Sequence, residues 1–415
     1  MAEWTKYKIS DIGTVVGGAT PSTKKSENYE NGDISWITPK DLSTFCGRYI
    51  KQGERNITET GYRSCSTQLL PRNSVLFSSR APIGYVAIAA KELCTNQGFK
   101  SVIPNENIDP LFLYYLLKYN KHNIESMGSG TTFKEVSANT MRNIIVFVPS
   151  DKRVQEKIAS ILGALDDKIE ENERINNNLE QQAQAIFKSW FVDFEPFNGT
   201  MPSDWKIVPL EKIVSFQNGY AFKSKELLNE PTSDCYQVFK QGHIARGGGF
   251  IPDGTKSWFP KSLSSKLERF VLKKGDILMA MTDMKDNVAI LGNTAIMPRD
   301  NEYIVNQRVG HLRANGYKSI TYPFVYLLTN STDFLVDLRS RANSGVQVNL
   351  SSAEIKASQT VLPTEKVNVA FSEITLPMFE TIINNQLENQ RLTQLRDSLL
   401  PKLMSGELDV SDIDL

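Results

Sequence analysis

The alternation of apolar and polar residues divides the first half of the chain into short strand patterns, a helix and one long helical pattern. Val75–Phe77, Tyr85–Ile88 and Ile144–Val148 are rich in β-branched and aromatic residues and lie between Gly, Pro, Asn and Ser, which is typical of strands. Pro110–Tyr119 starts with proline and continues as an apolar helical pattern. From about residue 152 to 190, apolar positions recur every three or four residues, which predicts a long helix with a heptad seam.

The same order of patterns occurs a second time. Strands are predicted at Asp276–Ala280, Val288–Ile290 and Gln359–Leu362, a helix at Pro323–Leu328, and a long helix from about 365 to 402. Sequence landmarks recur as well: Trp4–Ile12 as Trp205–Ile213, Asn96-Gln97 as Asn306-Gln307, Gly130 through Ser137 to Pro149 as Gly345 through Ser351 to Pro363, and Asn172, Asn176, Leu179 as Asn385, Asn389, Leu392. The chain is therefore predicted to be a duplicated unit whose copies diverge in their loops.

The two long helices are predicted to pair with each other. Each has roughly 38 residues and would extend about 57 Å at 1.5 Å per residue, which is too long to be covered by a domain of about 150 residues. Asn172 and Asn176 lie near the middle of one seam, and Asn385 and Asn389 near the middle of the other. In an antiparallel pair, only the midpoints of the two matched helices bring equivalent positions opposite each other. These asparagines are therefore expected to face one another and fix the register. Solvated asparagines at a loose seam are the alternative.

These patterns predict an α+β fold in which two pseudo-symmetric α/β domains are joined by two long antiparallel helices, a coiled coil. The predicted division is domain 1 (residues 1–150), helical region 1 (151–200), domain 2 (201–363), and helical region 2 with a C-terminal tail (364–415).

Charge is segregated along the chain although the 47 basic and 47 acidic residues balance. Domain 1 has 17 Lys and Arg against 13 Asp and Glu (+4), and domain 2 has 20 against 15 (+5). Helical region 1 has 6 against 10 (−4), and helical region 2 has 4 against 9 (−5). The basic domains are candidate phosphate-facing surfaces, and an ordinary solvated surface is the alternative.

Metal and membrane sites are not expected. Cys46, Cys65, Cys94 and Cys235 have no C-x-x-C spacing, which favours reduced thiols over a zinc site. No window approaches about 18 consecutive apolar residues, so a soluble, cytoplasmic protein is expected.

Several segments together resemble the specificity subunit of type I restriction-modification enzymes. They are Gly128–Ser137 leading to a strand and Pro149, Gln155–Ala159, Leu165–Ile169, Gln184–Phe191 and Leu399–Leu408. Their order, spacing and duplication carry the resemblance over essentially the whole chain. The second copy departs from the pattern, because Gly345–Ser351 lacks the paired threonines and is one residue shorter.

The resemblance implies a non-catalytic DNA-binding subunit of a type I restriction endonuclease and adenine methyltransferase complex. Domains 1 and 2 would be target-recognition domains, each reading one half of a split asymmetric target in double-stranded DNA. Two methyltransferase subunits would dock on the helices and domains, and restriction/translocase subunits would complete the enzyme. S-adenosylmethionine, ATP and Mg²⁺ are expected on those partners only, and no membrane contact is expected.

Motifs for catalysis are missing from the sequence. There is no glycine-rich S-adenosylmethionine turn, no Asn-Pro-Pro-aromatic motif, and no Walker A motif, since Gly247–Gly249 lacks a following Gly-Lys-Ser/Thr. Two alternatives stay open. One is a helical scaffold for protein assembly, and the other is an Mg²⁺-dependent nuclease that would use Asp253, Asp283 and Lys285.

Candidate DNA contacts are the Arg, Lys, Asn, Gln and small hydroxyl side chains that can read base edges from loops. They are Lys40, Ser79, Arg80, Gln97 and Lys134 in domain 1, and Gln241, His243, Arg246, Lys285, Gln307, Arg308 and Gln347 in domain 2. Each could instead be a surface or fold-supporting group. Because Asn96-Gln97 recurs as Asn306-Gln307, a framework or phosphate role is favoured over sequence-specific reading for this pair.

Overall fold

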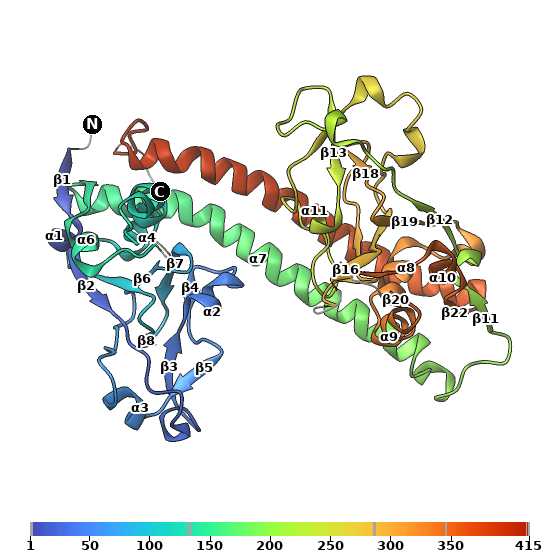
Figure 1. Ribbon diagram of the computed structural model, residues 1–415, viewed down its shortest axis with the longest axis horizontal. Coiled ribbons are helices and arrows are strands. Elements are labelled where there is room, and N and C mark those ends of the chain that lie inside the picture. Colours follow the sequence, from blue (N-terminus) through green and yellow to red (C-terminus); the bar gives the residue numbers. More distant parts are fainter. Residues whose placement is uncertain (1–2, 131–133, 285–287, 345–346, 412, 414–415) are drawn as a thin grey trace. The chain divides into compact units, whose positions relative to one another are not determined.

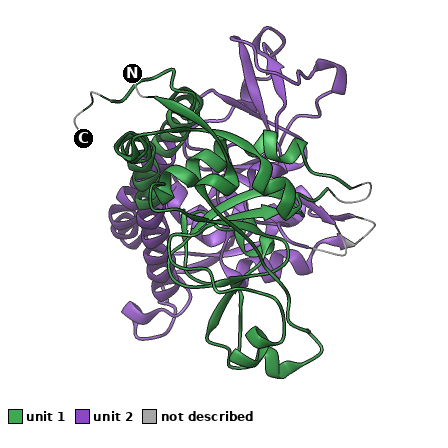
Figure 2. Cartoon of the chain, turned by 90° about the vertical axis from the view of Figure 1, so that its left-hand side faces the viewer, with its two compact units in different colours: residues 1–172, 388–415 green, residues 173–387 purple. Residues whose placement is uncertain are grey.

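The chain folds into two compact units in a computed structural model that describes residues 3–130, 134–284, 288–344, 347–411 and 413. Unit 1 consists of residues 1–172 and 388–415, and unit 2 of residues 173–387 (Figure 2). Each unit therefore contains one of the predicted domains together with one half of each long helix. None of the described helices is both long enough and apolar enough to cross a membrane.

Unit 1 is built on a five-stranded sheet of order β2-β9-β6-β7-β4, a three-stranded sheet of order β5-β3-β8 and a ribbon of β1 and β10 (Figure 1). Its strands are β1 Trp4–Lys8, β2 Gly13–Gly17, β3 Ile34–Ile37, β4 Tyr49–Ile50, β5 Arg55–Ile57, β6 Val75–Ser79, β7 Ile83–Ala89, β8 Cys94–Thr95, β9 Lys100–Pro104 and β10 Ile145–Pro149. Its short helices are α1 Ile9–Ile12, η1 Ser26–Asn28, α2 Pro39–Ser43, α3 Glu59–Arg63, α4 Pro110–Tyr119, α5 Lys121–Ser126 and α6 Ala138–Asn143.

Unit 2 has a four-stranded sheet of order β12-β19-β15-β17, two three-stranded sheets of orders β14-β13-β18 and β16-β21-β20, and a ribbon of β11 and β22. Its strands are β11 Lys206–Pro209, β12 Val214–Asn218, β13 Cys235–Phe239, β14 Trp258–Pro260, β15 Ile277–Ala280, β16 Thr282–Met284, β17 Thr294–Ile296, β18 Tyr303–Val305, β19 Val309–Ala314, β20 Asn343–Ser344, β21 Gln347–Asn349 and β22 Gln359–Leu362. Its short helices are η2 Glu195–Phe197, η3 Leu210–Lys212, η4 Ser224–Glu226, η5 Gln241–His243, η6 Lys261–Leu263, η7 Glu268–Phe270, η8 Tyr317–Ser319, α8 Tyr322–Thr329, α9 Thr332–Ser340 and α10 Ser352–Ala357.

The strand pairing confirms the duplication predicted from the sequence. In unit 1, β3 runs parallel to β8 and antiparallel to β5, and in unit 2, β13 runs parallel to β18 and antiparallel to β14. The antiparallel ribbon β1·β10 corresponds to β11·β22. Because parallel pairs between such short strands require long connections, the same unusual pairing in both units indicates one fold used twice. The α+β class is confirmed.

One predicted strand is wrong. Val288–Ile290 is not a strand, and the counterpart of β7 is β17, Thr294–Ile296. The physical reason is the Asp283 carboxylate, whose Oδ2 accepts the backbone N–H groups of Ala289 and Ile290, both at 2.7 Å. A side chain that captures successive backbone donors competes with a sheet ladder for them, so this segment is turned rather than extended.

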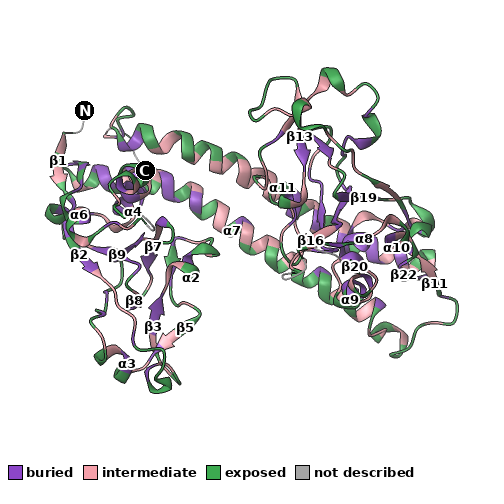
Figure 3. Ribbon diagram, in the orientation of Figure 1, coloured by how far each residue is buried: buried purple, intermediate pink, exposed green. Residues whose placement is uncertain are grey.

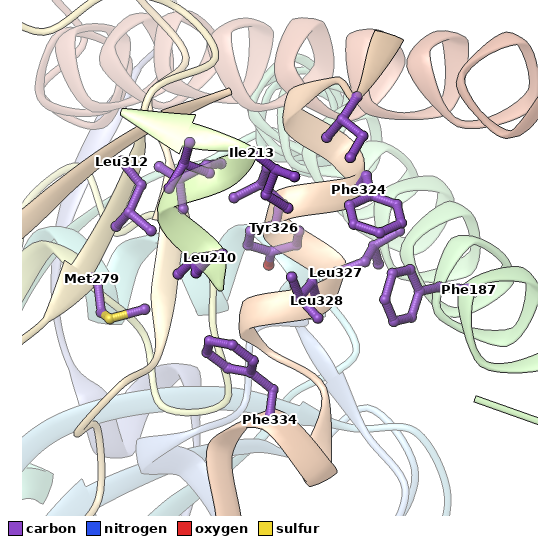
Figure 4. Close-up of a cluster of buried hydrophobic side chains, with 14 of the residues drawn as sticks. Phe187, Leu210, Ile213, Met279, Leu312, Phe324, Tyr326, Leu327, Leu328 and Phe334 are labelled. Carbon is purple, nitrogen blue, oxygen red and sulfur yellow. The ribbon is translucent and has the colours of Figure 1, made fainter. Parts of the chain in front are cut away.

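The core of unit 2 surrounds α8, which is buried on all sides, as expected for a helix that is apolar all round. Phe324 on α8 packs edge-on against Phe187 of the long helix, with ring centroids 5.4 Å apart (Figure 4). Burying such a side chain contributes roughly 1.5–3 kcal/mol. In unit 1, α4 has the matching place, and its first turn is capped by Asp109, which accepts the Phe112 N–H at 2.7 Å.

The long helices are α7, Lys152–Phe191, and α11, Glu365–Met404, each of 40 residues. Both match the predicted ranges to within two residues. Their seam positions are buried or half-buried, while their outer faces are exposed (Figure 3). The antiparallel pairing of the predicted fold is confirmed, with the first half of α7 beside the second half of α11 in unit 1.

The four seam asparagines meet as predicted. In unit 1, the buried Asn172 donates from Nδ2 to Asn389 Oδ1 at 2.8 Å. In unit 2, Asn385 Nδ2 donates to Asn176 Oδ1 at 2.9 Å. The solvated alternative is therefore wrong for Asn172, and the other three are half-buried.

Sequence patterns did not reveal a buried polar network that joins domain 1 to the helices within unit 1. The Asp166 carboxylate on α7 accepts the Tyr115 hydroxyl of α4 at 2.6 Å and the Arg396 Nη1 of α11 at 2.6 Å. Nearby, the buried Arg48 guanidinium donates to Glu170 and to Asp167 on α7. Asp166 and Arg396 are strongly coupled because both side chains are largely buried, so that removing one leaves the other uncompensated.

Candidate nucleic-acid interface

Three loops of domain 1 are joined at the end of β6. The Ser79 N–H donates to the Gly98 carbonyl at 2.7 Å, and the Ser79 carbonyl accepts the Val136 N–H at 3.0 Å. These bonds bring the loop after β6, the loop between β8 and β9, and the segment before α6 to one edge of the sheet. Loops on a rigid sheet edge are a common position for binding residues.

Domain 2 repeats this junction at the end of β15. The Met281 N–H donates to the Arg308 carbonyl at 3.2 Å, and the Met281 carbonyl accepts the Leu350 N–H at 2.9 Å. Met281 thus has the place of Ser79, Arg308 that of Gly98, and Leu350 that of Val136. The two halves of the chain have the same loop junction, with different side chains on it.

The junction of domain 1 brings together three nominated residues, and a fourth is adjacent. Arg80, Gln97 and Lys134 lie on the three loops, and Gln97 and Lys134 are exposed. Lys40 is exposed on α2, next to Pro39, whose ring lies against Gly98, and it pairs with Glu54 at 2.8 Å.

Sequence reasoning missed Lys100 and Glu135 at the same junction. The Lys100 ammonium lies 3.3 Å from Glu135, and Arg80 lies 3.7 Å from the same carboxylate. Glu135 therefore neutralises part of the positive charge of this edge. Lys100 lies only three residues after Gln97. The recurrence of Asn96-Gln97 as Asn306-Gln307 was therefore the sequence signal that could have identified Lys100 as part of this junction.

The junction of domain 2 brings together Gln307, Arg308 and Gln347, all exposed. Gln347 lies on β21, opposite Met284 of β16, whose strand follows the end of β15 directly. Gln241 is half-buried, and its amide donates to the Thr282 carbonyl, so it supports the loop. Arg246 is exposed on a separate turn, which is fixed by the Gly249 N–H donating to the Thr294 carbonyl at 2.9 Å.

For two of the candidate residues, the predicted DNA contact is wrong because their side chains are buried. Ser79 is fully buried, and its hydroxyl donates to the Gly98 carbonyl at 3.1 Å. His243 is fully buried in a stack with Phe239, with ring centroids 5.0 Å apart, and burial lowers its pKa to about 4. Neither side chain can reach a base edge from these positions, so both support the fold. Lys285 lies outside the described residues.

The geometry gives the proposed nuclease no metal site in the described part of the chain. No group of three or more His, Cys, Asp and Glu side chains is arranged there to hold a metal ion. The Asp283 carboxylate already accepts hydrogen bonds from backbone N–H groups. Burial raises the pKa of Asp283, but these hydrogen bonds outweigh it, so the pKa is lowered.

These features define a class of protein: a duplicated α+β chain with two long paired helices, in which each copy has the same loop junction but different side chains on it. Its family follows from comparison with known proteins. The family model described as type I restriction modification DNA specificity domain matches residues 1–181 and 202–396, and the chain belongs to this family.

Named relatives agree with the family. The type I restriction enzyme MjaIX specificity subunit of Methanocaldococcus jannaschii is 33% identical, covering 99% of this chain and 95% of the relative. The HindI specificity subunit of Haemophilus influenzae is 27% identical, covering 98% of this chain and 100% of the relative. A solved S subunit of a type I restriction-modification system from M. genitalium has the same fold, with a TM-score of 0.61 at 19% identity over 97% of this chain and 96% of that one.

The family confirms that the chain is a specificity subunit for DNA recognition and not one of the enzymes of such a system. The individual DNA contacts named above stay predictions.

Proposed function

We propose that each domain of this chain reads one half of a bipartite, asymmetric target in double-stranded DNA. The observation that carries the proposal is the loop junction that recurs in both domains with the same backbone hydrogen bonds and different exposed side chains. A common backbone geometry suits a common ligand, since phosphate and sugar contacts position a protein on any DNA sequence. Divergent side chains on that geometry suit two different base sequences.

The proposal extends to the protein partners. Two methyltransferase subunits dock on the chain, and restriction/translocase subunits join them. The acidic helical regions support this division of surfaces, because their charges of −4 and −5 would repel DNA while leaving long exposed helix faces for proteins. S-adenosylmethionine, ATP and Mg²⁺ would then be held by the partners.

Domain exchange tests the bipartite reading. The full chain is assembled with its methyltransferase subunits, and the methylated sequence is mapped before and after residues 1–150 are replaced by those of a relative. We expect one half of the target to change and the other half to persist. The exchange of residues 201–363 is the matched experiment, and it should change the opposite half. An exchange that alters both half-sites would contradict the proposal.

Two simpler measurements separate the alternatives. Sequence-specific binding in a gel shift, lost when the specific duplex is replaced by an unrelated one of equal length, distinguishes a DNA reader from a helical scaffold. Cleavage of DNA by the highly purified chain with Mg²⁺ alone would instead support the nuclease.

A further inference from the structure

The loop between β8 and β9 in domain 1 is organised by Asn96. Its side-chain Oδ1 accepts the Gly98 N–H at 2.8 Å, which closes a tight turn around Gln97. Its own N–H donates to the Ile37 carbonyl at 2.9 Å, which fixes this turn to the end of β3. Gln97 is left exposed at the tip of a turn that is anchored at both ends.

Asn306 does the same in domain 2. Its Oδ1 accepts the Arg308 N–H at 3.2 Å, and its N–H donates to the Phe239 carbonyl at 3.0 Å, at the end of β13. Gln307 is exposed at the tip, as Gln97 is in domain 1. The turns therefore share these two bonds and the same tip residue in two domains whose other loops differ. The tip glutamines differ in one further bond each, since the Gln97 side chain accepts the Thr20 hydroxyl and the Gln307 N–H donates to the Tyr220 carbonyl.

A glycine approaches each turn so closely that no side chain could replace it. A Cβ atom on Gly18 would lie 2.2 Å from the Asn96 carbonyl oxygen, and one on Gly219 would lie 2.2 Å from the Asn306 carbonyl oxygen. Neighbouring backbone in both domains is thus shaped to hold an Asn-Gln turn at this place. The two glycines thus hold the backbone of the turn, and with it the position of the tip glutamine, in the same way in both copies.

The residue after the glutamine is where the two turns differ. In domain 1 it is Gly98, and a Cβ atom there would lie 2.8 Å from Pro39 Cγ, so the space for a side chain is filled. In domain 2 it is Arg308, and Gln241 stands where domain 1 has Pro39. The Arg308 side chain is exposed, and its guanidinium has no carboxylate partner among the residues that the structure describes. In contrast, Arg80 and Lys100 of domain 1 share Glu135.

We propose that Asn96 and Asn306 are positioning residues that hold Gln97 and Gln307 against the DNA, and that Arg308 is a specificity-determining residue of domain 2 that domain 1 lacks. This inference rests on the proposed reading of one half-site by each domain. The two glutamines make the contact common to both half-sites. Arg308 contacts the edge of a guanine, whose O6 and N7 atoms match the two parallel donors of a guanidinium.

The chemistry explains why the asparagine matters for Arg308. The Asn306 Oδ1 binds the backbone N–H of Arg308 itself, so the direction of the arginine side chain depends on the turn. A bidentate contact requires the guanidinium plane to be aligned with the base edge, because a misaligned guanidinium loses one of its two hydrogen bonds.

The test uses the full chain assembled with its methyltransferase subunits. DNA duplexes with a single base-pair substitution at each position of the mapped target compete with the original duplex for binding to the assembly. The ratio of the two affinities gives the discrimination at each base pair. The variants are Arg308→Gly, which copies domain 1, Asn306→Ala, and Asn306→Asp, which keeps the acceptor for the Arg308 N–H. The affinity ratio cancels the general repulsion between the added Asp charge and DNA.

We expect Arg308→Gly to lower discrimination roughly tenfold to hundredfold at one base pair of the half-site read by domain 2, with the other half-site unchanged. Asn306→Ala should relax the same base pair to a smaller extent, and Asn306→Asp should restore it. Asn96→Ala is the matched variant of domain 1. It should lower affinity without relaxing the half-site of domain 2.

A uniform loss of affinity for all duplexes, with a salt slope reduced by about one, would assign Arg308 to a phosphate and overturn the inference. Relaxation by Arg308→Gly without any effect of Asn306→Ala would overturn the positioning role. If the wild-type assembly itself has no sequence preference, the proposed function fails, which is a different result from unchanged discrimination in the variants.

Discussion

Replacing Arg396 by methionine should destabilise unit 1 strongly, because it leaves the Asp166 carboxylate buried without a cation. The side chains of Asp166 and Arg396 are only 7% and 17% exposed, and their contact is 2.6 Å. The Tyr115 hydroxyl would be the remaining partner of the carboxylate. Removing one member of a buried ion pair typically costs 3–5 kcal/mol, and the partial exposure of Arg396 favours the lower end, about 3 kcal/mol.

The expected effect is large enough to measure by calorimetry of the full chain. Unit 1 comprises residues 1–172 and 388–415. For a unit of this size, 1 kcal/mol shifts Tm by roughly 2–4 °C, so Arg396→Met should lower the transition of unit 1 by about 6–12 °C. Arg391→Met is the matched control on the same helix, because Arg391 is exposed, and it should have little effect.

A double variant distinguishes the ion pair from simple loss of packing. Adding Asp166→Asn to Arg396→Met removes the uncompensated charge while keeping an acceptor for Tyr115, so it should recover part of the lost stability. The reasoning is refuted if Arg396→Met is no worse than Arg391→Met, or if the double variant loses the sum of the two single effects.

The remaining predictions concern the seam, one histidine and catalysis. Replacing Asn172, Asn176, Asn385 and Asn389 together by leucine should raise Tm while permitting other registers or oligomers, and an unchanged Tm with a single unchanged species by light scattering would contradict this. Burial lowers the pKa of His243 to about 4, so the unfolded chain binds a proton there below about pH 6.5 while the folded chain does not, and stability falls by up to about 3 kcal/mol as the pH drops from 6.5 to 4. His243→Phe should flatten the dependence of Tm on pH over that range, and equal slopes would show that His243 does not titrate as described. The purified chain should show no turnover with DNA and Mg²⁺, ATP or S-adenosylmethionine, and any activity that copurifies with the chain through several steps would disprove this.

The sequence by itself determined the features that repeat or follow a local period. The duplicated order of elements, the ranges of both long helices and the facing seam asparagines were all predicted from spacing alone, because a helix of 40 residues shows many turns of its pattern. Short strands carry a weaker signal, and the displaced strand at Val288–Ile290 shows how one side chain, Asp283, can redirect a segment.

The tertiary structure alone decided which candidate side chains are exposed. Ser79 and Arg80 are adjacent in sequence, yet one is buried at a strand end and the other is half-exposed. His243 was a candidate DNA contact, but its ring stacks on Phe239 inside the core. Exposure depends on pairing between segments far apart in the chain, such as Ser79 with Gly98 and Val136, and no local pattern encodes it. The same holds for Asp166, Tyr115 and Arg396, whose charges and hydroxyl meet only because three helices pack together.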